Sequence, residues 1–132
     1  MSATMPESHR DLLDTPVAAF STIGPKGYPQ TTAVWFLNDN GRIVVVIHPD
    51  RQKMKNLQAT PKCDFFIVDP ANPMRTLEIR ADITFEADED FAYADKLSTK
   101  YGMDVRTLYA PGRHHVACLL DPVRVNAINM GG

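Results

Sequence analysis

The sequence predicts a mainly β protein, a small β-barrel with flanking α-helices, as one domain over residues 1–132. Three observations predict this class. Six or seven segments are rich in β-branched and aromatic residues, which favour strands. Turn residues separate them, and they follow one another directly, without the alternating helices of a parallel sheet. Such a run of antiparallel strands loses its exposed edges by closing into a barrel.

The composition is that of a soluble globular domain. Lys and Arg number 14 and Asp and Glu 16, a formal charge of −2, and 44% of the residues are hydrophobic. This balance argues against a basic nucleic-acid module. The longest aliphatic run is residues 43–47, whereas a membrane span needs about 20 apolar residues, and no signal peptide is recognisable. We therefore expect a cytoplasmic protein with neither a nucleic-acid nor a membrane partner.

The two cysteines, Cys63 and Cys118, each lie in an apolar, strand-like run. In a reducing compartment such residues are buried free thiols, which is our expectation here. A disulfide between adjacent strands is the alternative.

The first half of the chain reads as strands punctuated by Gly, Pro and Asn turns. Residues 1–16 form a lead-in with a short helix at 7–14, which ends before Pro16. Asn40-Gly41 is a favoured hairpin pair. The run at 43–47 is continuously apolar, which predicts a strand covered on both faces. The expected strands are 17–23, 30–37 and 42–48.

The second half mixes strands with two helices. A helix is expected at 50–60 with Asp50 as its N-cap, and another at 88–101 with an acidic first turn. Residues 77–85 alternate strictly between apolar and polar, so one face of that strand lies in the core. Residues 69–73 and 102–113 are loops, the second with a short helical piece. The other expected strands are 63–68, 116–120 and 123–128, the last two separated at Asp121-Pro122.

A cluster of cations follows the third expected strand. Arg51, Lys53 and Lys55 lie at a strand-to-helix junction, just after His48-Pro49. The first turn of a helix has free N–H groups and a partial positive charge, so added cations make the junction suited to a phosphate. The alternative is a solvated helix flank whose cations pair with surface carboxylates.

Trp35 and Phe36 occupy adjacent positions of the second strand and therefore face opposite sides. One of them can pack in the core while the other lines a pocket or a subunit contact, or both can be structural. Thr31 and Thr32, just before them, can offer hydroxyl groups to a ligand or simply fill the strand.

Other polar clusters indicate no site. His114 and His115, after Arg113, are adjacent and point in opposite directions on a strand, so a structural or interface role is expected and no metal site is predicted. Glu78, Asp82 and Glu86 share one strand face, which is typical of a solvated or interface surface. The dinucleotide fingerprint, the P-loop and the nucleophile elbow are absent from the sequence.

Taken in order, several motifs carry a family resemblance: Gly24-x-x-Gly27, Pro29-Gln30, Ala33-Val34-Trp35-Phe36, the strand 43–47, Arg51-x-Lys53-x-Lys55-Asn56-Leu57, the loop 69–73 and Leu77-Glu78-Ile79-Arg80. Their order and spacing, from about residue 17 to residue 128, resemble the pyridoxamine 5′-phosphate oxidase-like (FMN-binding) split-barrel superfamily. Within it the chain is most similar to the small branch of oxidoreductases that use the deazaflavin coenzyme F420.

The resemblance implies a six-stranded split β-barrel and a homodimer whose two cofactor sites are built at the subunit interface. It implies that the cofactor phosphate is held by Arg51 and Lys53, with weaker assignments to Lys55 and Asn56. The deazaflavin or flavin ring would lie against the second strand. The residues assigned near the ring, or between ring and phosphate, are Thr31, Thr32, Val34, Trp35, Ile47, His48, Pro49 and Met74.

The implied activity is hydride transfer between coenzyme F420 and a small electron-poor acceptor of the enone, quinone or tetrapyrrole class. No proton donor is assigned, since solvent can supply the proton. The alternatives are an FMN-dependent flavin reductase or oxidase on the same barrel, and a non-catalytic protein that binds a cofactor, haem or another tetrapyrrole. Vitamin B6 oxidation is not expected, because the Arg and His set that binds that substrate's phosphate has no counterpart here. The loop 102–113 is a candidate for acceptor specificity or for packing.

Overall fold

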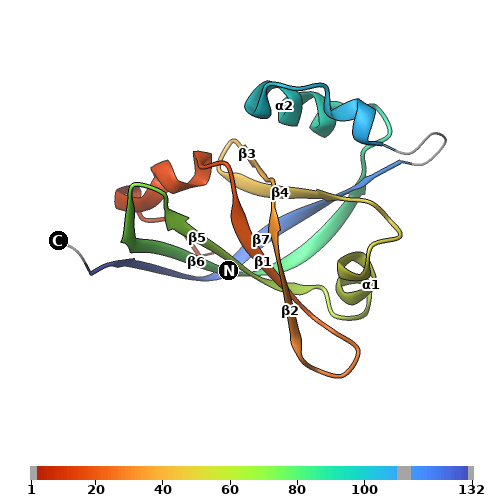
Figure 1. Cartoon of the computed structure of the whole chain (residues 1–132). Coiled ribbons are helices and arrows are strands. Elements are labelled where there is room, and N and C mark those ends of the chain that lie inside the picture. Colours follow the sequence, from red (N-terminus) through yellow and green to blue (C-terminus); the bar gives the residue numbers. More distant parts are fainter. Residues whose placement is uncertain (1–2, 110–113, 131–132) are drawn as a thin grey trace.

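The computed structural model describes residues 3–109 and 114–130, which form one curled antiparallel sheet with helices at its rim and on its faces (Figure 1). The sheet has the order β2-β1-β5-β6-β7-β4-β3 in the described part of the chain. This confirms the mainly β split-barrel class, with seven strands in place of the six that the resemblance implies. The strands are β1 (Ala18–Ile23), β2 (Pro29–Val34), β3 (Leu37–Asp39), β4 (Arg42–Ile47), β5 (Lys62–Asp69), β6 (Asn72–Ala87) and β7 (Val116–Asn129).

The sheet is curled because its two end strands are consecutive in the chain. Only Trp35 and Phe36 separate β2 from β3, yet these strands lie at opposite ends of the sheet order. A single strand over 30–37 is therefore a wrong prediction. The N–H of Phe36 donates to the hydroxyl of Tyr101 (3.0 Å) and its carbonyl accepts from the Lys100 amine (2.8 Å), so the backbone leaves the ladder at this residue.

Helices are present at the three expected places, each with a different start or geometry. They are the 3-10 helix η1 (Glu7–Asp14), α1 (Gln52–Ala59) and α2 (Ala92–Tyr101), with a further 3-10 turn η2 (Val105–Leu108) in the predicted loop. The N-cap prediction for Asp50 is wrong, because a turn from the Arg51 N–H to the His48 carbonyl (3.1 Å) delays the helix.

The core has two layers, one on each face of the sheet. Inside the curl, the Phe65 ring meets the edges of Phe20 (6.3 Å) and Phe36 (5.0 Å). On the other face, α2 packs Ala94 and Leu97 against β3, β4 and β7, which agrees with its position beside β3 and β4 in Figure 1. The strand β4 is therefore covered on both sides, as its apolar run predicts.

Two further expectations have clear outcomes. Cys63 and Cys118 are buried and form no disulfide, and burial raises the pKa of each thiol to about 12.

The predicted break between two strands at Asp121-Pro122 is wrong, because β7 runs through both residues. Pro122 lies opposite Ala81, where the register shifts, so a bulge accommodates the residue that lacks an N–H.

Two carboxyl groups are neighbours on the outer face of the sheet. Burial, and then the nearby Glu78, raises the pKa of Asp64 to about 6, while a hydrogen bond from Asp64 holds the pKa of Glu78 below its usual value. Asn126 also donates to Glu78 (2.8 Å), and Arg80 lies 3.5 Å from it. Asp64 therefore keeps a proton to about pH 6 beside the carboxylate of Glu78.

This pair predicts a pH dependence of stability. The folded state holds the Asp64 proton up to about pH 6, whereas the unfolded chain releases it near the ordinary aspartate pKa of 3.8. The contribution of Asp64 to stability is therefore present at low pH and is lost as the pH rises towards and through 6. Thermal unfolding should show that Asp64→Asn, which keeps a donor to Glu78, removes this pH-dependent loss of stability. Asp82→Asn, on the same face, is the control and should leave it; equal profiles for both variants would contradict the proton assigned to Asp64.

Candidate functional site

A cavity of about 520 Å³ lies where the ends of β2 and β4 meet the start of α1 and the loop after α2. Its walls are aliphatic, its aromatic members are Trp35 and Tyr109, and one end is polar. The polar members are His48, Arg51, Lys53 and His115. The cavity thus combines a flat, apolar region with a cationic end, which is the general form of a site for a small molecule or cofactor.

The flat region is built at an edge of the sheet. Trp35 is 42% exposed, and one face of its ring stacks on Tyr101 at 4.1 Å with an interplanar angle of 6°. In the described residues β2 pairs only with β1, so one row of its backbone N–H and C=O groups is unused by the sheet. These groups can bond to the polar edge of a ring that lies beside Trp35.

The cationic end is built by the start of α1. Arg51 is the residue before the helix, and no side chain caps the free N–H groups of the first turn. The Lys53 amine donates to the Thr32 hydroxyl (2.8 Å), which holds it against β2. Burial, and then the charge of Arg51, lowers the pKa of Lys53. Neither cation forms an ion pair with a carboxylate of the described chain, so this end is suited to an anion.

The far wall depends on the buried carboxylate of Asp88. It accepts the N–H groups of Tyr93 and Ala94 at 3.0 Å each, which starts α2 four residues later than the acidic run predicts. It also accepts the Tyr109 hydroxyl at 2.5 Å, and its own N–H donates to the His115 carbonyl at 3.0 Å. One residue therefore joins α2, the loop after η2 and the start of β7.

The structure brings half of the sequence-predicted site residues together in this cavity. Those that line it are Val34, Trp35, Ile47, His48, Arg51 and Lys53. Thr32 contacts Lys53, and with Thr31 it lines a neighbouring hollow of about 320 Å³.

The other predicted residues lie outside the described lining. Pro49 and Lys55 flank it at the approach to α1 and on that helix. The amide of Asn56 is buried and donates to Thr22 (3.0 Å) and Gln30 (2.8 Å), so it fastens α1 to the sheet. Met74 lies on β6 beside Met130, at the opposite end of β7 from His115. Within one chain, Met74 and the cavity are apart.

Eight lining residues were not assigned to a site from the sequence, and four of them are aliphatic wall residues: Ala33, Val45, Val46 and Leu97. Val105, Leu108 and Tyr109 belong to the loop that was expected to serve specificity or packing. His115 was expected to be structural. The prediction that His114 and His115 point in opposite directions is confirmed, since His114 is exposed and His115 is buried. The buried ring of His115, however, borders the cavity. Arg113 lies outside the described residues.

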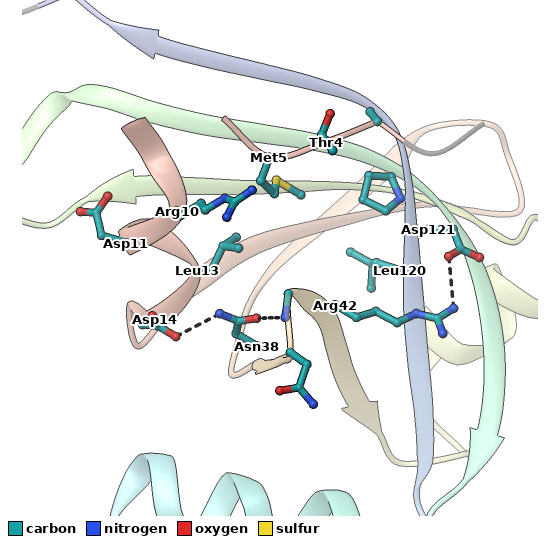
Figure 2. Close-up of a pocket in the computed structure, with 14 residues that line it drawn as sticks. Thr4, Met5, Arg10, Asp11, Leu13, Asp14, Asn38, Arg42, Leu120 and Asp121 are labelled. Atoms are coloured by element: carbon teal, nitrogen blue, oxygen red, sulfur yellow. Dashed lines mark hydrogen bonds and ion pairs between the residues drawn. The ribbon is translucent and has the colours of Figure 1, made fainter. Parts of the chain in front are cut away.

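A second, more open cavity of about 810 Å³ lies among the lead-in, η1, the β3–β4 turn and β7 (Figure 2). Two pairs of its polar side chains are bonded to each other: Asn38 donates to Asp14 (3.2 Å) and Arg42 to Asp121 (3.2 Å). Its described lining contains no aromatic residue. The smaller cavity is the better candidate, because it combines a ring surface with two neighbouring cations that form no ion pair among the described residues.

Comparison with known proteins agrees with this geometry. The family model described as pyridoxamine 5′-phosphate oxidase matches residues 5–128. The chain belongs to the pyridoxamine 5′-phosphate oxidase family. This family includes oxidoreductases and proteins that bind flavin-like cofactors. A comparison with curated proteins finds no match.

Solved structures of similar fold have different described roles. An F420 reductase is 28% identical with a TM-score of 0.80, and the match covers 92% of this chain and 98% of that one. A conserved hypothetical protein of Mycobacterium tuberculosis is 18% identical (TM-score 0.81, 97% and 87% covered). A heme storage protein of Vibrio cholerae is 12% identical (TM-score 0.74, 96% of each chain covered). At these last two identities the likeness shows the fold alone.

No helix among the described residues is long and apolar enough to cross a membrane. Residues 3–109 and 114–130 contain no group of three or more His, Cys, Asp or Glu side chains that could hold a metal ion.

The cavity wall yields a stability prediction at Asp88. Asp88→Ala removes the acceptor for two helix N–H groups and the Tyr109 hydroxyl, so it should lower the free energy of unfolding by about 2 kcal/mol. Urea unfolding measures this, with Glu89→Ala, at an exposed neighbouring position, as the control. A loss no larger than that of the control would contradict the role given to Asp88.

Proposed function

We propose that the protein binds coenzyme F420 in the 520 Å³ cavity and transfers a hydride between it and a small electron-poor organic acceptor. The observation that carries this proposal is that one cavity joins an aromatic surface and an unpaired strand edge to two cations without carboxylate partners. The 28% identity to an F420 reductase over nearly the whole of both chains supports the choice of cofactor.

The chain's own residues fit two parts of such a cofactor, its phosphate and its ring. Arg51 and Lys53 are suited to its phosphate, the first as a planar donor and the second as a point charge on a half-buried stem. Trp35 and the free backbone edge of β2 are suited to its ring. When bound, the deazaflavin supplies the hydride; the protein orients it and excludes water with its aliphatic wall.

FMN is the second candidate cofactor. Its ribityl phosphate would use the same two cations, so Arg51 and Lys53 serve either molecule. A flavin reductase or oxidase would then operate on the same barrel. Binding of a cofactor or tetrapyrrole without turnover is a third possibility, and acceptor screening separates it from the two enzymes.

The acceptor would enter beside the loop that follows α2. Val105, Leu108 and Tyr109 add apolar surface to the cavity that Trp35 also lines, which favours a small, uncharged, conjugated molecule such as an enone or a quinone. Differences in this loop would then decide which acceptor fits. The free thiols of Cys63 and Cys118 support a reducing, cytoplasmic location.

We further propose that the protein acts as a homodimer. The outer face of the sheet exposes an apolar patch of Val17, Phe66, Val68 and Ile128. The hollow at this patch is bordered by Ala33, which also lines the candidate cavity. A second copy seated here would cover the patch and complete the cofactor site at the same time. It would also offer a route for Met74 to approach the ring from the partner side.

The cofactor proposal is tested by titrating the purified protein with coenzyme F420, followed by its fluorescence, and with FMN, followed by quenching. F420 should bind in the micromolar range and more tightly than FMN. Arg51→Ala and Lys53→Ala should each weaken binding by roughly tenfold to a hundredfold, because each removes a charge-assisted contact. Higher salt should weaken the wild-type complex.

Lys26→Ala, in the exposed turn before β2, is the matched control and should bind like the wild type. Tighter binding of FMN would move the protein to the flavin class. Binding of neither cofactor, or unchanged binding by both cavity variants, would overturn the cofactor site.

The dimer proposal predicts that Phe66→Asp yields a monomer. The wild type should have twice the chain mass of 14.7 kDa by light scattering, and the variant the single mass, because a carboxylate cannot be buried in an apolar contact. Cofactor binding should weaken in the same variant. Met103→Asp, an exposed apolar position near the end of α2, is the control. A wild-type monomer would refute the proposal.

A further inference from the structure

His115 has an unused ring nitrogen at the cavity. The residue is only 8% exposed, and its Nδ1 atom is buried without a hydrogen-bond partner. It borders the cavity together with Arg51 and Lys53. Buried polar atoms are nearly always paired in native proteins, so an orphaned imidazole nitrogen beside a cavity needs a reason.

The ring is held in a fixed position. It stacks on Tyr109 with centroids 3.8 Å apart and an interplanar angle of 14°. Tyr109 is in turn held by its hydrogen bond to Asp88, and the His115 carbonyl accepts the Asp88 N–H. The His48 ring stands perpendicular to His115 at 5.0 Å. The imidazole is therefore oriented before any ligand arrives.

The groups around His115 set its charge. Burial, followed by the nearby His48 and Arg51, lowers the pKa of His115, and the carboxylate of Asp88 opposes this shift. Lys53 on α1 adds a further positive charge to the same cavity. Tyr109 stays protonated, because burial and Asp88 raise the pKa of its hydroxyl. His115 is thus uncharged at neutral pH when no ligand is bound.

We propose that His115 is a proton-linked member of the anion site: it takes up a proton when an anionic group binds at Arg51 and Lys53. A bound anion offsets the positive charges that oppose imidazolium, whereas the attraction of Asp88 remains. Protonation also makes both ring nitrogens donors and places a third positive charge at the cavity. This inference rests on the cofactor site proposed above and adds to it a residue and a pH dependence.

The linkage has a definite sign. A group whose pKa rises on binding makes the complex tighter as the pH falls. Between pH 8 and pH 6, the dissociation constant of the anionic cofactor should decrease by roughly threefold to tenfold through this one proton. Riboflavin carries the flavin ring without the phosphate, so its affinity should not change in this way.

The test compares wild type, His115→Asn and His114→Asn by titration with coenzyme F420, FMN and riboflavin from pH 6 to pH 8. Wild type and the exposed control His114→Asn should bind the two anionic cofactors more tightly at low pH. His115→Asn should bind them at pH 8 within about threefold of wild type but lose the dependence. Because each variant is compared with the wild type for the same ligand, the titration of the ligand's own phosphate cancels.

Calorimetry of the wild type in two buffers of different ionisation enthalpy gives the number of protons taken up, and an NMR titration of the His115 ring with and without FMN gives its pKa directly. Both measurements use the wild-type protein, so they test the proposal even if the His115→Asn variant fails to fold. An unchanged pKa, a zero proton count, or a pH dependence lost in His48→Asn and kept in His115→Asn would overturn the inference and leave the cofactor site standing. If neither cofactor binds the wild type at any pH, the proposed function fails as well.

Discussion

The hydrogen bonds between Phe36 and the end of α2 are the interaction on which the rest of the structure depends. The chain passes from one edge strand of the sheet to the other within two residues, so the sheet must curl until those edges meet. At that seam the backbone of Phe36 has left both strands, and its buried polar groups need partners. Tyr101 and Lys100 supply them, and the Phe36 ring fills the inside of the curl.

The seam also has an electrostatic component. Burial lowers the pKa of Lys100 to about 8, yet its amine lies 3.7 Å from the centroid of the Phe36 ring and donates to the carbonyl beside it. A cation–π contact and one hydrogen bond thus offset part of the desolvation. The same α2 is fixed at its other end by Asp88. With both ends held, Trp35 at the seam and Tyr109 near Asp88 are both fixed in the lining of the cavity.

The sequence predicts those features of the fold that depend on residues close together along the chain. Alternation in β6, the Asn40-Gly41 hairpin and the apolar run of β4 are local, and all three are present. The seam depends on a contact between Phe36 and Tyr101, 65 positions apart, so the second strand reads as continuous when the sequence is taken alone. The start of α2 also depends on a distant contact, because Asp88 caps α2 from outside the helix while it bonds to Tyr109. At the site, the cations after β4 are recognisable from their spacing, but His115 reaches the cavity only through pairing of β7 with β4.

The cationic end of the cavity is unusual within this mildly acidic chain. Elsewhere, charged side chains are matched: Lys62 pairs with Asp82 (2.7 Å), Lys96 with Asp39 (2.9 Å) and Arg106 with Asp95 (2.8 Å). Lys55 has no carboxylate partner among the described residues but is exposed to water, and half-buried Lys100 contacts the Phe36 carbonyl and ring. Lys53 has neither a carboxylate partner nor full exposure to water. It is half-buried, lies beside Arg51 and is bonded only to a neutral hydroxyl. A positive charge in that setting is destabilised until an anion arrives, and the orphaned nitrogen of His115 lies at the same cavity. A solvated helix flank would need neither a half-buried lysine nor a buried, unpartnered imidazole, so the two together favour an anion-binding role for this end of the barrel.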